Sequence, residues 1–167
     1  SGPAYIFVPI DIVDLQVPAA ALKTPLDLTP PQDDKLIQAA TDAVLSELYA
    51  SKSPAIFVDC LVDRHNAIKE LETHPNYLGV YNGMVSGLGV AAAIEKSDCV
   101  LIVGSLASDT NSGGFTRKVL PENAIYLDAF TTTIKGVTFS PAPLKPLLAS
   151  IVSQLNPSQV PSASIPA

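Results

Sequence analysis

The chain has 167 residues, which is enough for one domain with a hydrophobic core. Hydrophobic residues make up 47% of it and charged residues only 16%, so we expect a partner to cover part of its surface. The formal net charge of −6 argues against nucleic acid, because binding a polyanion requires clustered Lys and Arg. No apolar run reaches the roughly 18 residues of a membrane span and no signal peptide is recognisable, which favours a cytoplasmic protein.

The two cysteines, Cys60 and Cys99, fall at or in predicted buried strands. This position favours reduced thiols over a disulfide framework. We interpret Cys60 as a buried small hydrophobe and not as a nucleophile. The sequence has no zinc-type spacing, so we expect no metal site.

The N-terminal part of the chain indicates an element that belongs to another domain. Residues 5–8 are apolar and predict a strand, which Pro9 ends. A proline-rich stretch without helical period follows. We therefore expect residues 1–31 to be the end of a preceding domain plus a linker, in a chain cut from something larger.

From residue 32 the pattern changes to alternating helices and strands. Apolar residues at helical spacing predict a helix over residues 32–52. Further helices are expected at 67–71, 88–96 and 144–155, and strands at 54–59, 99–103, 124–128 and, as a short edge strand, 136–139. This order predicts an α/β fold with three layers and a doubly wound, mostly parallel sheet over residues 32–155. Residues 156–167, rich in Ser, Pro and Ala, read as a flexible linker toward a missing C-terminal domain.

The predicted central strand is Cys99–Val103, because its five apolar residues run without a polar break. The polar loop after it leaves the carboxyl end of the sheet, where α/β folds place ligands. Its Ser and Asp residues could form a nucleophilic set, but the only histidines are His65 and His74. We favour a structural loop in which Asx side chains bond backbone donors. Its residues are Asp109, Asn111, Gly113 and Phe115.

A glycine-rich stretch, Gly83-Met-Val-Ser-Gly-Leu-Gly89, precedes the helix expected at 88–96. Its spacing differs from the dinucleotide fingerprint, and no clear strand comes before it. A phosphate loop would need Gly-Lys-Ser/Thr, which is absent. We favour a glycine-rich helix start that packs closely, with nucleotide binding as the alternative.

Arg64 and His65 follow the strand expected at 54–59, on the side where the Gly104 loop opens. A cation at this place could pair with a small carboxylate, and arginine is the better bidentate partner. The alternative is a surface ion pair with Asp63, Asp59 or Asp109. The residues alone leave both readings open.

Three segments of the sequence carry a resemblance to a known family. They are Val58-Asp-Cys-Leu-Val-Asp-Arg-His65, Thr73-His-Pro-Asn-Tyr-Leu-Gly-Val-Tyr-Asn-Gly83 and the loop 104–115, in this order. Together they resemble the middle domain of the thiamine-diphosphate-dependent 2-oxo acid decarboxylases, most of all the fungal pyruvate decarboxylases. The resemblance covers most of residues 3–155. Residues 4–11 look like the last strand of the preceding pyrimidine-binding domain of that family.

The resemblance implies a Rossmann-like domain of the NAD/FAD-binding-like middle-domain type without catalytic residues. The parent enzyme would convert a 2-oxo acid to an aldehyde and CO₂ with thiamine diphosphate and Mg²⁺, both held by its outer domains. This fragment alone is expected to be inactive and to hold no cofactor. Its partners would be the N- and C-terminal domains of the same enzyme, in a homo-oligomer. The alternatives are an FAD/NAD-type nucleotide-binding module of a related oxidase or synthase, and a pure oligomerisation module.

The resemblance also implies a regulatory site for a 2-oxo acid. Arg64 matches the family arginine that helps to hold the activator, His65 matches its neighbour, and Ser105 and Ala129 fall where other pocket residues lie. The activation cysteine of yeast-type enzymes falls on Leu61, one position after Cys60. Because a one-residue shift points a strand-end side chain the other way, we do not expect thiol-based activation.

One departure from the family concerns the chain after His65. There the family has a full helix and another strand, whereas this chain has only residues 66–72 before Thr73. Either a βα unit has been deleted, or the sequence skips residues near Leu71–Glu72.

Overall fold

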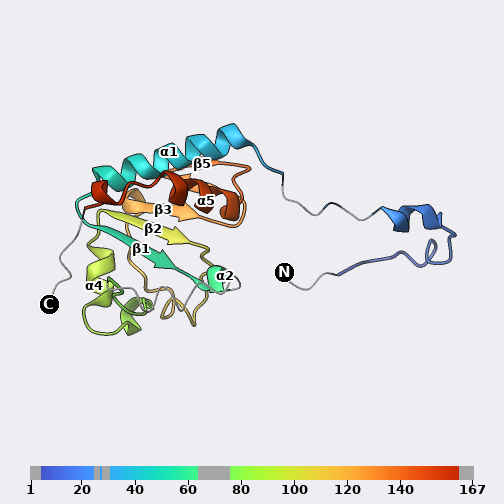
Figure 1. Ribbon diagram of the computed structural model, residues 1–167. Helices are drawn as coiled ribbons and strands as arrows, with labels where there is room; N and C mark the ends of the chain where they lie inside the picture. Colours follow the sequence, from blue (N-terminus) through green and yellow to red (C-terminus); the bar gives the residue numbers. More distant parts are fainter. Residues whose placement is uncertain (1–4, 25–26, 28–30, 64–75, 162–167) are drawn as a thin grey trace.

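The computed structural model describes residues 5–24, 27, 31–63 and 76–161, and its centre is a five-stranded sheet (Figure 1). The strands lie in the order β1-β2-β3-β4-β5. Their bounds are β1 Pro54–Val58, β2 Cys99–Val103, β3 Ala124–Leu127, β4 Thr132–Ile134 and β5 Val137–Phe139. The pairs β1/β2 and β2/β3 are parallel, whereas β3/β4 and β4/β5 are antiparallel. The α/β class is confirmed, but the prediction of a mostly parallel sheet is wrong, because the sheet is mixed.

The antiparallel half of the sheet is a hairpin that the sequence did not indicate. Lys135 and Gly136 both have positive φ, 47° and 82°, which is the backbone of the tight turn that suits a two-residue hairpin. β4 has only three residues, and its first, Thr132, is polar although buried. A strand this short shows no periodicity. The edge strand expected at 136–139 is present as β5.

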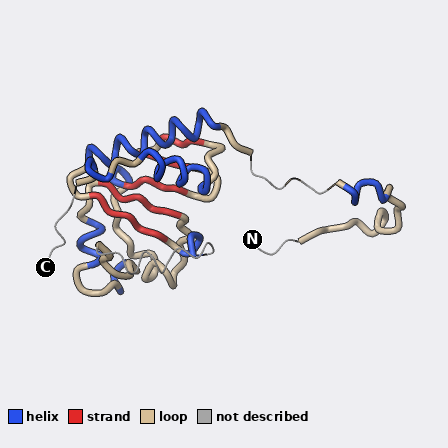
Figure 2. The backbone as a smooth tube through the Cα atoms, in the orientation of Figure 1, coloured by secondary structure: helices blue, strands red, loops and turns tan. Residues whose placement is uncertain are grey.

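Helices cover both faces of the sheet, as expected for three layers (Figures 1 and 2). On one face lie α1 (Asp34–Ala50) and α5 (Leu144–Gln154), which fit the helices predicted at 32–52 and 144–155. On the other lies α4 (Val90–Glu95), within the range predicted at 88–96. Asp33 starts α1, because its carboxylate accepts hydrogen bonds from two N–H groups of the first helical turn.

The hydrophobic core has one cluster on each face of the sheet. The larger cluster joins α1 and α5 to alternate residues of β2 and β3, and the smaller joins α4 to the residues between them. All five residues of β2 are buried, so the prediction of a central strand is confirmed. The residue before β2 also holds the backbone just before β1. The Asp98 carboxylate accepts hydrogen bonds from Lys52 N and Ser53 N at 2.8 and 2.9 Å.

The strand predicted at residues 5–8 is absent, which corrects the sequence interpretation. Residues 5–20 are all exposed, and Tyr5, Ile6 and Phe7 have 85–90% of their surface in contact with water. A strand requires a neighbour for its N–H and C=O groups, and no described strand pairs with this segment. A short 3₁₀ helix, η1 (Ala19–Lys23), follows.

The end of the described chain packs against α1. The Asn156 N–H donates to the Tyr49 hydroxyl at 2.8 Å, and residues Pro157–Gln159 form the 3₁₀ helix η4. These contacts involve the first residues of the predicted linker 156–167, whose role as a linker stays a prediction. The helix predicted at 67–71, the break expected near Leu71–Glu72 and the pair Arg64 and His65 lie outside the described residues. No described helix combines the length and hydropathy that a membrane crossing needs.

Candidate functional site

The candidate site lies where the carboxyl ends of β1, β2 and β3 meet. Asp59 follows β1, Ser105 comes two residues after the end of β2, and Asp128 follows β3. Parallel strands bring these positions to one edge of the sheet, and the backbone continues the pairing there, since Asp59 N donates to Val103 O. This edge carries the charged and polar residues of the site.

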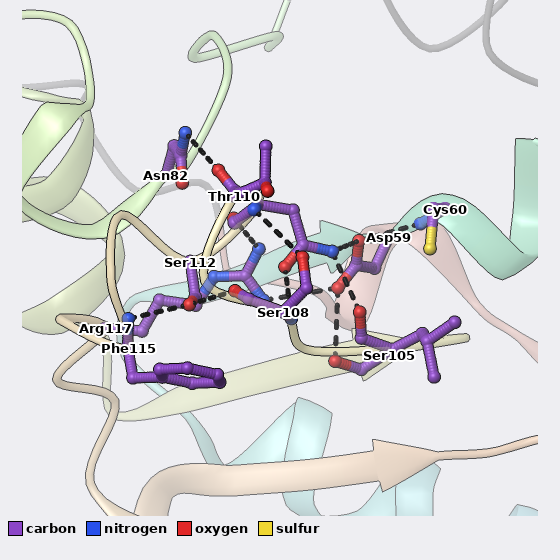
Figure 3. Close-up of polar contacts among 11 residues, drawn as sticks. Asp59, Cys60, Asn82, Ser105, Ser108, Thr110, Ser112, Phe115 and Arg117 are labelled. Carbon is purple, nitrogen blue, oxygen red and sulfur yellow. Dashed lines mark hydrogen bonds and ion pairs between the residues drawn. The ribbon is translucent and has the colours of Figure 1, made fainter.

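Asp59 is the centre of the site and is 8% exposed (Figure 3). One carboxylate oxygen accepts from Cys60 N at 2.8 Å and from Asn111 Nδ2 at 3.2 Å. The other accepts from Ser105 Oγ at 3.2 Å and forms an ion pair with Arg117 Nη1, also at 3.2 Å. Because every oxygen is already bonded, Asp59 is not available as a general base in this arrangement.

Arg117 is held from several sides. Its guanidinium carbon lies 4.3 Å from the centre of the Phe57 ring and 5.7 Å from that of Tyr81, both within cation–π range. Nη2 donates to the carbonyl of Asn111, whereas the buried Nε has no hydrogen-bond partner among the described residues. The guanidinium therefore links the sheet edge, two aromatic rings and the loop after β2.

The loop between β2 and Arg117 is braced by its own side chains. Asn111 Oδ1 accepts from Ser108 N at 2.8 Å, and Asp109 Oδ1 accepts from Thr110 N at 2.7 Å, so the expected Asx bonds are present. The hydroxyl of Ser112 accepts from Phe115 N at 2.8 Å and donates to Ser108 O. The Ser108 hydroxyl accepts from Asn111 N at 3.2 Å. Both serine hydroxyls are thus used by the backbone, which does not fit a nucleophile.

The glycine-rich stretch packs against this loop. Gly83 has φ +52°, and a Cβ there would meet Thr116 Oγ1 and lie 2.6 Å from Ser112 O. Gly113 is equally confined, because its Cβ would lie 2.5 Å from Asn82 O. The stretch forms the 3₁₀ turn η2 (Gly83–Val85), and residues 76–82 contain no strand. These contacts favour the close-packing interpretation over a dinucleotide fingerprint.

The Tyr81 ring packs beside Phe57 and Arg117. Its ring meets Phe57 edge-on at 5.4 Å, and its hydroxyl donates to Glu95 Oε1 at 2.8 Å. Lys118 N donates to both of these oxygens, at 3.2 Å to Tyr81 and 3.1 Å to Glu95. Burial, aided by the Glu95 carboxylate, raises the pKa of Tyr81 to about 12. A phenol with this pKa stays protonated near neutral pH.

The structure describes two of the four residues predicted for the effector pocket. Ser105 is half-buried and is bonded to Asp59. Ala129 is exposed beside the end of β3, and its carbonyl accepts from Leu144 N at 3.1 Å. Both lie at the carboxyl edge of the sheet. Arg64 and His65 belong to the part of the chain that the structure does not describe.

The two cysteines differ in their exposure to solvent. Cys99 is buried in β2, and burial raises the pKa of its thiol to about 11. Cys60 is exposed, so its interpretation as a buried hydrophobe is wrong. The reason is local: the chain leaves β1 at Asp59 and turns at once into α2 (Cys60–Asp63), which places Cys60 outside the sheet. Neither thiol is in a disulfide.

Sequence reasoning missed Arg117, although it weighed Asp59 as an ion-pair partner for another cation. The two lie 58 positions apart, and only the fold brings them together. The sequence did offer one signal for this pair: an Asp directly after a buried strand, and a single arginine after the polar loop that follows the next strand. Within the described residues, no group of three or more His, Cys, Asp or Glu is placed so that it could hold a metal ion.

Fold and site together define an α/β domain in which Asp59 and Ser105, at the ends of β1 and β2, are bonded to each other and Asp59 is paired with Arg117. Over about 90% of its length the chain is homologous to fungal pyruvate decarboxylases. It is 32% identical to pyruvate decarboxylase isozyme 3 of Saccharomyces cerevisiae over 90% of this chain, and 33% identical to pyruvate decarboxylase of Aspergillus fumigatus over 93%. The pyruvate decarboxylase of Kluyveromyces lactis is 31% identical over 92%. No known family model matches the chain.

The chain spans 31% of the length of each of these relatives. The aligned stretch with the S. cerevisiae relative covers 173 positions, whereas 90% of this chain is about 150 residues. The relative therefore has about 20 residues more within the same stretch.

Proposed function

We propose that this chain is the non-catalytic central domain of a pyruvate (2-oxo acid) decarboxylase, acting as a scaffold within and between subunits. The observation that carries the proposal is the homology, which takes in about 90% of this chain but only 31% of the relatives. The described site supports it, because the Asp59 carboxylate and the hydroxyls of Ser105, Ser108 and Ser112 are bonded within the domain. The parent enzyme would convert a 2-oxo acid to an aldehyde and CO₂.

In this proposal, thiamine diphosphate and Mg²⁺ belong to other domains of the parent. The described residues contain no cluster of three or more metal-binding side chains, and the sequence has no Gly-Asp-Gly motif. The N- and C-terminal domains of the same enzyme, and further copies of it, would cover the charge-poor surface. We assign no catalytic step to any residue of this chain.

The experiment compares the 167-residue chain with its full-length parent. Each is mixed with thiamine diphosphate, Mg²⁺ and pyruvate, and aldehyde is measured with an NADH-coupled dehydrogenase. We expect aldehyde from the parent and none from the chain. Aldehyde from the chain alone, or an inactive parent under conditions that support a known pyruvate decarboxylase, would contradict the proposal.

The same proposal includes a regulatory 2-oxo acid pocket formed by Arg64, His65, Ser105 and Ala129. Ser105 and Ala129 share the carboxyl edge of the sheet, and an arginine is suited to a carboxylate. Binding of the unreactive amide pyruvamide and of pyruvate to the parent would be compared with that of its Arg64→Ala variant by calorimetry. Loss of one binding event supports the pocket, and equal affinity excludes it.

A further inference from the structure

The sequence contains a single Asn-Gly pair, Asn82-Gly83. An asparagine side chain can react with the next peptide nitrogen, and a following glycine favours this reaction because it has no side chain to hinder the approach. The Gly83 nitrogen attacks Asn82 Cγ, the Cγ–Nδ2 bond breaks, and ammonia leaves with the Gly83 amide proton. Water then opens the succinimide ring to give aspartate or isoaspartate. The reaction consumes water, releases ammonia, and neither oxidises nor reduces any group.

The folded structure holds Asn82 away from this ring closure. Its Nδ2 donates to Thr110 O at 3.2 Å (Figure 3), and its buried Oδ1 has no hydrogen-bond partner among the described residues. Asn82 N donates to Ser86 Oγ at 2.8 Å. A five-membered ring requires Asn82 Cβ and the Gly83 nitrogen on the same side of the Cα–C bond, whereas at the observed ψ of 54° they lie on nearly opposite sides. Closing the ring therefore requires a rotation about this bond, which the hydrogen bonds of Asn82 oppose.

The space around the Asn82-Gly83 pair does not fit the products of the reaction. A Cβ on Gly83 would lie 2.6 Å from Ser112 O, and one on Gly113 would lie 2.5 Å from Asn82 O. Isoaspartate lengthens the main chain by a carbon atom at this confined point. Both products also replace an amide that donates to Thr110 O by a carboxylate, which only accepts hydrogen bonds. Either product therefore works against the packing of the two segments.

We propose that Asn82-Gly83 is a deamidation site that the closed packing of two loops, residues 76–89 and 104–117, protects from reaction. The rate of deamidation follows the fraction of molecules in which these loops have separated, because only then is Asn82 free to rotate. The change goes one way, since the ammonia has left and the product does not fit between the closed loops. Opening of the loops is thereby recorded in the covalent structure. This inference concerns the loops alone and does not depend on the activity of the parent.

Ageing at mildly alkaline pH tests the protection. The 167-residue chain and a synthetic peptide with the sequence of residues 79–86 are incubated in the same buffer, and conversion at Asn82 is followed by peptide mapping with mass spectrometry. We expect conversion in the chain to be at least about tenfold slower than in the peptide, which corresponds to loops that are open in less than about a tenth of the molecules. Protection below about tenfold overturns the proposal.

Two variants that loosen the loops test the cause of the protection. Thr116→Val removes the hydroxyl that accepts from Met84 N at 2.9 Å, and Ser86→Ala removes the acceptor of Asn82 N. Each is expected to accelerate conversion at least about twofold, the effect of losing one hydrogen bond. Thr133→Val is the matched control, because its hydroxyl bonds within the β4–β5 hairpin, and its rate should equal that of the wild type. Circular dichroism checks that all three variants fold, and wild-type rates in both loosening variants overturn the proposal.

The aged sample also tests whether the product resists closure. Converted chains carry an additional negative charge and can be separated from unconverted chains by ion exchange, and an isoaspartyl methyltransferase assay measures their isoaspartate. We expect the fraction converted at Asn82 to unfold at a lower urea concentration than the unconverted fraction of the same sample. Equal unfolding midpoints would show that the product fits between the closed loops, which contradicts the one-way change.

Discussion

At the scale of single residues, the Asp59–Arg117 pair is largely removed from water, with side chains 6% and 16% exposed. Removing two charges from water costs several kcal/mol per ion, and their attraction offsets this only where further hydrogen bonds satisfy both groups. The carboxylate has three further donors, and the guanidinium has the Phe57 ring and the Asn111 carbonyl. We interpret the pair as fixing the position of the loop after β2.

Arg117→Met is expected to lower the free energy of unfolding by about 3–5 kcal/mol, because it leaves the Asp59 carboxylate buried without its cation. The measurement is urea denaturation followed by circular dichroism. Lys135→Met is the control, since it breaks the more exposed Lys135–Glu47 pair and should cost less than about 1 kcal/mol. Equal losses in the two variants would show that burial of the Asp59 pair has no special effect.

Tyr81 gives a prediction for alkaline pH. Its folded pKa of about 12 lies above the ordinary value of 10.0, chiefly through burial and then through Glu95. Between these values only the unfolded chain releases the proton, so the folded state loses stability as pH rises from 10 toward 12. Urea titrations at several pH values should show a shallower decline for Tyr81→Phe than for the wild type. Parallel declines would contradict the raised pKa.

At the scale of elements, two loops far apart in sequence form one unit beside the sheet. Asn82 Nδ2 donates to Thr110 O at 3.2 Å, and Met84 N donates to Thr116 Oγ1 at 2.9 Å. The backbone of Gly83 lies directly against Ser112. Such an approach requires a residue without a Cβ that accepts positive φ.

Gly83→Ala is therefore expected to destabilise the fold by about 3 kcal/mol, from left-handed backbone strain plus overlap with the facing loop. Gly114→Ala is the matched control: φ is +72°, but nothing lies within 4 Å of its Cβ position, so strain alone should cost about 1–2 kcal/mol. Thermal unfolding of both variants tests the difference. Similar losses would mean that the close contact with Ser112 does not matter.

Most elements of the fold could be predicted from local patterns. α1 and α5 carry apolar residues at helical spacing over several turns, and β2 is an unbroken apolar run. β4 could not be predicted, because a three-residue strand that begins with a buried Thr has no period. The strand at residues 5–8 was wrongly predicted, because strand propensity is realised only beside a pairing partner.

The candidate site was less predictable than the fold. The Asx bonds of Asp109 and Asn111 are local, and the sequence indicated them. The Asp59–Arg117 pair depends on the sheet bringing a strand end and a distant loop residue together, which no spacing rule reveals. Whether Arg64 and Ser105 form one pocket stays a prediction.

At the scale of the whole molecule, the N-terminal segment contributes little to the packed domain. Residues 5–20 are exposed throughout, and neither core cluster contains any of them. Removing residues 1–31 is therefore expected to change the free energy of unfolding by less than about 0.5 kcal/mol, as for surface changes. Urea denaturation of the shortened and full chains checks this, and a loss of several kcal/mol would show that the segment packs on the domain.

The order of the strands in the sheet has a consequence for how the chain assembles during synthesis. Among the described strands, each pairs with its neighbour in sequence, so from β2 onward each strand finds an earlier partner already made when it leaves the ribosome. The helix layer does not share this advantage. α1 is among the first elements made, but α5, against which it packs through Thr41 and Ser150, is the last helix of the sheet domain. The apolar face of α1 can pack on β2 and β3 as soon as these strands are made, whereas its cover by α5 forms only at the end of the domain.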